Sequence, residues 1–251
     1  MTPNYQNPDN LRRDQYKDAS NLDARVALHS QFTISAQPWQ TWVFDQIALQ
    51  PGERVLECGG GPGWLWRENL DRLPADCHIT FTDLSEGMIA EAQTALAQAG
   101  DHFTFQTANI MGLPFEDGSF DVVVANHMLY HVPDRPAALA EIKRVLQTNG
   151  RFLAATNGKN HLAELRQLGR DLVPLSGVTP EELPPGAGFR LEDGRFQLQP
   201  YFNQIELRLY DSHLAVTEAR RQQVAQQVQQ IIAEEGYFHI SKDTGIFIAH
   251  P

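Results

Sequence analysis

The chain has few cysteines, a deficit of basic side chains and no long apolar run. Its 251 residues include two cysteines, Cys58 and Cys77, which excludes a disulfide framework and a four-cysteine zinc site. Lys and Arg number 20 against 31 Asp and Glu, a formal net charge of −11. This acidic balance disfavours nucleic acid as a partner, because binding to phosphates depends on clustered cations.

Membrane-spanning and targeting segments are also missing from the sequence. No stretch approaches the ~18 consecutive apolar residues of a membrane helix. Residues 1–8 lack a basic region followed by an apolar one, so we expect no signal peptide. The sequence therefore predicts a reduced, cytoplasmic protein, and its 42% hydrophobic residues are sufficient for a core.

Strand-like and helix-like segments alternate along most of the chain. The apolar runs that predict strands lie at 54–58, 78–83, 103–105, 120–125, 151–156, 204–210 and 238–249. The last of these contains Gly245, and we expect one strand there with a possible irregularity. Helices between strands indicate βαβ units, so the predicted fold class is α/β with a Rossmann-like, doubly wound, mostly parallel seven-stranded sheet.

The front of the chain is predicted to be helical. Ser20 and Asp23 resemble a capping box, and Pro38 suits the first turn of a second helix that ends at Pro51–Gly52. Residues 1–50 are therefore expected to form a helical arm and lid.

The rest of the chain, residues 51–251, is predicted to be the main domain. Helices are expected at about 161–172 and 217–235. The Pro- and Gly-rich segment 174–203 is expected to be a cap or substrate insertion.

A glycine-rich loop, Gly59–Gly63, joins the first strand to a helix expected to run to about Leu73. Glycine lets a backbone approach a ligand closely, although a tight turn alone would explain this loop equally well. Asp83 lies 20 residues after Gly63, at the end of the second strand. A carboxylate there can accept both hydroxyls of an adenosine ribose.

Two residues distinguish this loop from the dinucleotide-binding fingerprint. Trp64 stands where the third glycine is needed, and its bulk hinders helix–strand packing. Glu57 would repel a pyrophosphate but attract an ammonium group. A ligand with adenosine at one end and a cationic amine at the other is S-adenosylmethionine.

Three segments resemble, in order, motifs of a known family. Residues 55–63 and 82–88 resemble the first two motifs of class I S-adenosylmethionine-dependent methyltransferases. Residues 113–123 are similar to the third region of the ubiquinone/menaquinone C-methyltransferase subgroup. The resemblance covers about residues 50–157. It implies S-adenosylmethionine as methyl donor, S-adenosylhomocysteine as product, an N-terminal helical cap and an antiparallel closing strand.

By resemblance, one group of residues would hold the methionine part of the cofactor. Glu57, Gly59, Gly61 and Gly63 belong to the first motif, and Asn126 would lie beside the same part of the ligand.

A second group would hold the adenosine. Asp83 would bind the ribose, and Leu84 and Met88 would lie near the adenine. Asn109 stands where the family commonly has an Asp that reads the adenine amino group, and its amide oxygen can accept the same hydrogen bond. Ile110 would follow it beside the ring.

His127 and His131, after the fourth strand, are candidate general bases, because their unperturbed pKa is near neutral. His131 has the alternative role of fixing its loop by hydrogen bonding. A tyrosine such as Tyr16 is a third catalytic candidate.

Aromatic side chains of the arm divide into two sets. Tyr16, His29 and Phe32 are candidates for a lid over the sulfonium, because aromatic faces attract cations. Trp39 and Trp42 are expected to pack the arm on the sheet.

The sequence thus predicts a methyltransferase acting on a small-molecule acceptor, with no metal site. The segment after the fourth strand lacks the Asn/Asp-Pro-Pro-Tyr/Phe pattern of enzymes that methylate nucleic-acid bases. A non-catalytic S-adenosylmethionine-binding subunit or sensor is a second hypothesis. A nucleotide-cofactor oxidoreductase is a third, which Glu57 and Trp64 oppose.

Overall fold

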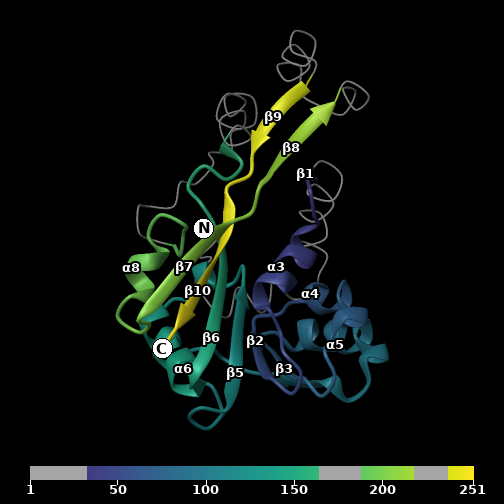
Figure 1. Cartoon of the computed structure of the whole chain (residues 1–251), viewed down its shortest axis with the longest axis vertical. Coiled ribbons are helices and arrows are strands. Elements are labelled where there is room, and N and C mark those ends of the chain that lie inside the picture. The colour runs from purple at the N-terminus through teal and green to yellow at the C-terminus, as the bar shows by residue number, and fades with distance from the viewer. Residues whose placement is uncertain (1–32, 164–187, 218–236) are drawn as a thin grey trace, which may run out of the picture.

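The computed structural model describes residues 33–163, 188–217 and 237–251. A seven-stranded sheet forms its centre, with the order β4-β3-β2-β5-β6-β10-β7 (Figure 1). The strands are β2 Arg54–Cys58, β3 His78–Asp83, β4 Phe103–Thr107, β5 Phe120–Asn126, β6 Leu146–Asn157, β7 Gln204–Leu209 and β10 Thr244–His250. Strands β2 to β6 run parallel, and β10 is antiparallel to both of its neighbours. The predicted sheet is confirmed, with the antiparallel strand inserted between β6 and β7.

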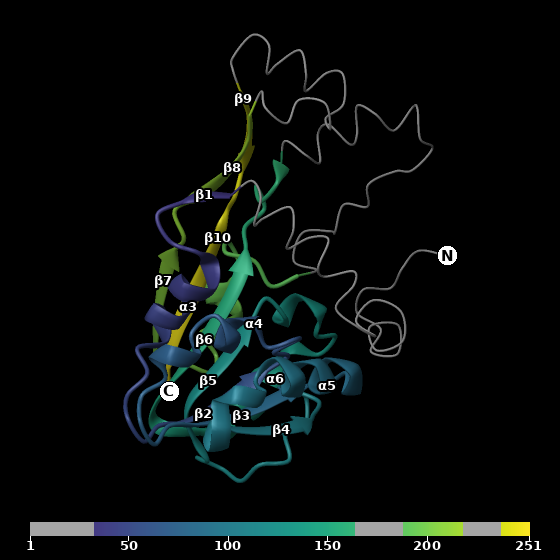
Figure 2. The same ribbon diagram turned by 90° about the vertical axis from the view of Figure 1, so that its right-hand side faces the viewer.

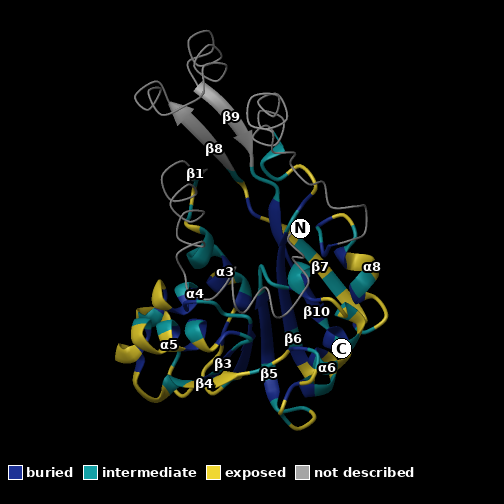
Figure 3. Ribbon diagram, turned by 180° about the vertical axis from the view of Figure 1, so that it is seen from behind, coloured by how far each residue is buried: buried dark blue, intermediate teal, exposed yellow. Residues whose placement is uncertain are grey.

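Helices cover both faces of the sheet and complete two apolar cores. One face carries α3 Trp39–Ile47, α4 Trp64–Arg67 and α5 Glu86–Ala95, and the other carries α6 Arg135–Val145 and α8 Gly194–Leu198. In β5, Val122 and Val124 face the first core and Val123 the second, all of them fully buried. Figure 3 shows the central strands as the most buried part of the molecule. A strand buried on both faces reads as a continuous apolar run, which is why the sequence revealed it.

The strand order reverses between β2 and β5. The chain moves from β2 outward to β3 and β4, then returns to β5 on the other side of β2. The loops after β2 and β5 therefore leave the sheet in opposite directions, and a crevice opens at their carboxyl ends. In such sheets ligands bind at this point.

The helix predicted to reach Leu73 is shorter than expected. It ends as α4 at Arg67, and a separate 3₁₀ turn covers Leu70–Arg72. Asn69 leaves helical geometry with φ −135°, and its buried amide donates to the Leu65 carbonyl at 2.7 Å. Asn side chains that satisfy nearby backbone groups in this way interrupt helices.

The single strand predicted at 238–249 is two strands in two sheets. β9 Tyr237–Ser241 pairs with β8 Ser212–Thr217, and β8 pairs with β1 Thr33–Ser35, in a three-stranded antiparallel sheet that the sequence did not predict. Figures 1 and 2 show this sheet projecting beyond the main one. The change of sheet falls between β9 and β10, whereas Gly245 lies within β10 and pairs with Thr156 and Leu209.

Several sequence predictions fall outside the described residues. These are the capping box at Ser20, the helix at 217–235 apart from Thr217, most of the helix at 161–172, and the side chains of Tyr16, His29 and Phe32. Of the predicted insertion 174–203, residues 188–203 are described. They pack on the sheet through the buried side chains of Phe189, Leu191, Leu198 and Phe202.

Arg151 fixes the position of α3 on the sheet. From β6, its guanidinium forms a bidentate ion pair with Glu53 at 2.6 and 2.7 Å. The same group donates to the Ile47 carbonyl at 2.7 Å, at the end of α3. Both side chains of the pair are 17% exposed. Bidentate pairs with this little exposure are stronger than surface pairs.

We predict that Arg151→Ala lowers the free energy of unfolding by about 2 kcal/mol, because it removes several charge-assisted hydrogen bonds. Arg67→Ala is the matched control, since Arg67 pairs with Glu68 at the surface, where the two side chains are 47% and 51% exposed. It should cost below about 1 kcal/mol. Urea unfolding measures both values, and equal losses would contradict this account of Arg151.

Candidate functional site

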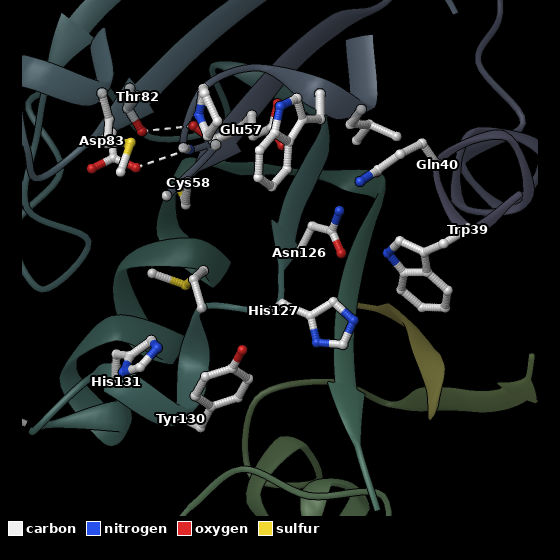
Figure 4. Close-up of a pocket in the computed structure, with 18 of the residues that line it drawn as sticks. Trp39, Gln40, Glu57, Cys58, Thr82, Asp83, Asn126, His127, Tyr130 and His131 are labelled. Atoms are coloured by element: carbon white, nitrogen blue, oxygen red, sulfur yellow. Dashed lines mark hydrogen bonds between the residues drawn. The ribbon is translucent and has the colours of Figure 1, made fainter. Parts of the chain in front are cut away.

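A cavity of about 1200 Å³ opens at the carboxyl ends of the central strands (Figure 4). It takes in the predicted cofactor residues other than Gly63, together with both predicted histidines. These lining residues are Glu57, Gly59, Gly61, Asp83, Leu84, Met88, Asn109, Ile110, Asn126, His127 and His131. No residue of the described stretch 188–203 lines it. The structure thus brings together side chains from four different strand ends.

The loop after β2 needs glycine for two physical reasons. Gly59, Gly61 and Gly63 have positive φ angles of 66°, 60° and 80°, which strain other residues. At Gly60 a Cβ atom would lie 2.3 Å from Cζ of Phe81, so the loop is pressed onto that ring. Gly63 serves as the N-cap of α4. The loop backbone is held against the sheet and faces the cavity.

Glu57 ends β2 beneath this loop, and its side chain is buried. Its carboxylate accepts a hydrogen bond from the Trp66 indole, and its carbonyl accepts one from the Thr82 hydroxyl at 2.6 Å. Burial raises the pKa of Glu57 to about 8, the Trp66 bond opposes the rise, and the charge of Asp83 adds to it. The free protein therefore holds this acid largely protonated near neutral pH.

Asp83 lies at the end of β3 with both carboxylate oxygens fixed by the backbone. One oxygen accepts from the Gly61 amide at 2.9 Å, and the other from the Ser85 amide at 2.8 Å (Figure 4 shows the first). Burial raises the pKa of Asp83, and these amides partly offset the rise. A carboxylate has about four acceptor positions, so this group keeps acceptor capacity for a ligand.

The cavity wall beside Asp83 has an apolar part and a polar part. Met88 and Ile110 are buried, and Leu84 is partly exposed. Asn109 follows β4, and its Oδ1 accepts from the Met111 amide at 3.0 Å. An amide oxygen accepts two hydrogen bonds, so Asn109 retains one acceptor position.

Asn126 and His127 leave β5 in the middle of the cavity. The Asn126 Oδ1 atom is buried and has no hydrogen-bond partner among the described residues. His127 has φ 56°, which is unusual for a residue with a side chain, and its amide donates to the Ala155 carbonyl at 3.2 Å. Strain of this kind is typical of functional positions. The His131 ring is farther along the same loop, 4.5 Å from the Tyr130 ring centre.

Two residues of α3 were not predicted to belong to the site. The Nε1 atom of Trp39 and the Oε1 atom of Gln40 are buried and, like Asn126 Oδ1, lack a partner within the described residues. Trp39 and Trp42 also pack against the apolar core on this face of the sheet, as the sequence predicted, and their ring centres lie 5.4 Å apart. Figure 4 shows the Trp39 indole nitrogen directed toward Asn126 and His127. Nothing in the sequence pattern distinguishes Gln40 from other polar helix residues.

The opposite end of the cavity is formed by Asn157, Tyr210, Lys242 and Thr244. The Thr244 hydroxyl donates to Asn157 Oδ1 at 2.9 Å. The Lys242 ammonium lies 5.3 Å from the centre of the Tyr210 ring. The sequence signal for this end was Lys242, a charged residue between the apolar residues of β9 and those of β10.

Cys58 is buried in the core. Burial raises the pKa of its thiol to about 12, with the Thr82 side chain opposing the rise. A thiol held protonated in this way is a poor nucleophile.

Comparison with known proteins identifies relatives of this chain. Residues 56–154 match the family model described as a methyltransferase domain. A demethylmenaquinone methyltransferase of Symbiobacterium thermophilum is 32% identical over 170 residues, which are 63% of this chain and 66% of the relative. A ubiquinone/menaquinone biosynthesis C-methyltransferase of Paracoccus denitrificans is 36% identical over 118 residues, 46% of each chain. The chain therefore spans about half to two thirds of the length of these relatives.

The fold also matches solved structures. A phosphoethanolamine N-methyltransferase 2 of Haemonchus contortus, in complex with phosphomonomethylethanolamine and S-adenosylhomocysteine, aligns with a TM-score of 0.60. The alignment covers 98% of this chain and 60% of that one at 19% identity, so the likeness concerns the fold. Among the described residues, none of the helices combines the length and apolar character needed to cross a membrane.

We predict that Glu57→Gln stabilises the ligand-free protein in a pH-dependent way. The folded-state pKa of Glu57 is raised from 4.5 to about 8, so its ionisation costs stability as pH rises through that window. Gln keeps an acceptor for the Trp66 indole but cannot ionise. Its unfolding temperature should match the wild type at about pH 5 and exceed it at about pH 9.

The exposed residue Glu116 supplies the control. Glu116→Gln should follow the wild type at both pH values in the same thermal unfolding experiment. A constant difference between Glu57→Gln and the wild type across this range would show that Glu57 is ionised in the folded protein throughout.

Proposed function

Because the chain belongs to the class I S-adenosylmethionine-dependent methyltransferase family, we propose that it transfers a methyl group from S-adenosylmethionine to a small-molecule acceptor. The relatives' names refer to demethylmenaquinone and to ubiquinone or menaquinone biosynthesis, which supports an acceptor of this kind. We further propose a cytoplasmic location, which the free thiols of Cys58 and Cys77 support.

Three buried polar atoms carry the proposal. Trp39 Nε1 is a hydrogen-bond donor, and Gln40 Oε1 and Asn126 Oδ1 are acceptors; all three lack partners within the described residues. Buried polar groups are costly unless paired, so atoms of this kind in a cavity point to a ligand. The amino-acid end of S-adenosylmethionine carries a carboxylate, which can accept from Trp39 Nε1. It also carries an ammonium, which can donate to Gln40 Oε1 and Asn126 Oδ1. The buried carboxyl of Glu57 supplies the countercharge for that ammonium.

The other half of the cavity fits the adenosine. The Asp83 carboxylate, held by the amides of Gly61 and Ser85, has acceptor positions left for the two ribose hydroxyls. Leu84, Met88 and Ile110 supply apolar contacts for the adenine. The remaining lone pair of Asn109 Oδ1 would accept from the adenine amino group. The glycine loop backbone would lie against the link between the two halves.

When bound, S-adenosylmethionine supplies a methyl group that moves to the acceptor in line with the breaking C–S bond, whose electron pair neutralises the sulfonium. The chain's own contribution is to align the acceptor with that methyl and to exclude water. His127 is proposed as the base for an acceptor that must lose a proton, because it stands between Asn126 and the far end of the cavity. His131 and Tyr16 remain proposals for the same role.

A cofactor-binding subunit or sensor would bind S-adenosylmethionine equally well without turnover. Formation of S-adenosylhomocysteine in the presence of candidate acceptors distinguishes the two. Binding without product formation by any small-molecule acceptor would favour the sensor.

We predict that Asp83→Ala weakens binding of S-adenosylhomocysteine by about tenfold to a hundredfold, because a charge-assisted hydrogen bond contributes ~1.5–3 kcal/mol. Calorimetric titration measures the affinity, and circular dichroism checks the fold. Asp83→Asn keeps one acceptor oxygen and should lose less. Asp101→Ala, at an exposed position of the 3₁₀ helix Ala97–His102, is the control and should bind as the wild type does. Wild-type affinity in Asp83→Ala would remove the ribose assignment.

A further inference from the structure

The cavity extends beyond the residues that the cofactor would occupy. Its far end lies where β6 finishes at Asn157 and β10 begins at Thr244, two residues that pair across the sheet. Strands are spaced about 4.8 Å apart, and β10 is three places from β2 in the sheet. This end is therefore roughly 14 Å from the strand that carries Glu57. The amino-acid end of the cofactor, bound beside Glu57, does not reach this far. This end of the cavity can therefore hold a second molecule.

An aromatic wall connects this end to the centre of the cavity. The Tyr210 ring centre lies 5.1 Å from that of Trp39 and 5.3 Å from that of Trp42. Trp39 in turn lies 5.0 Å from the His127 ring. The Tyr210 hydroxyl is fixed 2.8 Å from Ser35 Oγ and 2.5 Å from the Gln37 carbonyl. The Trp39 and Tyr210 rings meet edge-on, with 73° between their planes. They form an apolar corner that can contact one face and one edge of a planar molecule.

The ionisable groups of the cavity are separated along the same line. The carboxyl groups of Glu57 and Asp83 line the β2 and β3 end, together with the ion pair of Arg67 and Glu68. Lys242 lines the β6 and β10 end, together with the His161 ring beside Thr244. Lys242 is partly buried, with its ammonium over the Tyr210 ring. Burial lowers the pKa of Lys242 to about 8, which leaves it mainly protonated at neutral pH. An anion bound beside it would favour that charged form.

We propose that this end of the cavity binds a planar methyl acceptor through an anionic oxygen, of a phenolate, enolate or carboxylate, which pairs with Lys242. The inference rests on the proposed function, because it assigns to the acceptor the part of the cavity left by the cofactor. The acceptor's ring lies along Trp39 and Tyr210, and its reacting atom faces the centre near His127. Pairing with an ammonium in a partly buried site is strong enough to select an anionic acceptor over a neutral one.

The test uses two planar probes of equal shape and different charge. The full chain is first titrated with S-adenosylhomocysteine by calorimetry, which tests the proposed function by itself. The saturated protein is then titrated with 2-naphthoate and, separately, with 2-naphthamide. We expect the wild type to bind the naphthoate about tenfold to a hundredfold more tightly than the amide.

Variants of Lys242 assign the preference to its charge. Lys242→Met should bind both probes with similar affinity, because it keeps the side-chain length but loses the ammonium. Lys242→Arg should retain the preference for the naphthoate. Lys143→Met is the control; Lys143 lies outside the cavity and donates to the Tyr201 carbonyl at 2.6 Å, so this variant should keep the preference. All variants should bind S-adenosylhomocysteine with wild-type affinity.

Four outcomes overturn the inference. Equal affinity for the two probes in the wild type, or undetectable binding of both, would show that this end does not select a planar anion. Weaker S-adenosylhomocysteine binding in Lys242→Met would show that the lysine serves the cofactor carboxylate instead. Failure of the wild type to bind S-adenosylhomocysteine would remove the proposed function itself, and the inference with it.

Discussion

The structure depends on a carboxyl group buried at the end of the central strand. Glu57 lies under the glycine loop with Trp66 as its described hydrogen-bond donor, and burial raises its pKa to about 8. A buried carboxylate without a cation is unfavourable, so the free protein favours the neutral acid. The glycines after Glu57, the register of β2 and the packing of α4 all serve to keep this group inside the cavity. A cationic ligand would convert that cost into binding energy.

The sheet order arranges the two reactants on either side of this point. The strands on one side, β3 and β4, end in the side chains that suit adenosine. On the other side, β6 ends at Asn157, and the antiparallel β10 begins at Thr244, shortly after Lys242. β5 lies next to β2 and places Asn126 and His127 between the two groups. The reversal of strand order at β2 is therefore what separates a cofactor half from an acceptor half.

Local sequence patterns predicted the parts of the fold that depend on local interactions. The apolar strand β5 and the glycine loop each carry their cause within a few residues. The change of sheet after β9 depends on pairing with distant strands, and the early end of α4 depends on how Asn69 is buried. Trp39 and Gln40 enter the site because Arg151 holds α3 on the sheet, a contact across more than one hundred positions of sequence. Such contacts leave no local pattern.

Proton release on cofactor binding tests the central claim most directly. S-Adenosylmethionine is titrated at about pH 7 in buffers of different ionisation enthalpy, with the wild type and Glu57→Gln side by side. If the ligand's ammonium pairs with Glu57, binding lowers that raised pKa, so the wild type releases close to one proton and Glu57→Gln releases far less. Equal release by both proteins, or binding with none, would contradict the claim that a buried neutral acid awaits a cationic ligand at this site.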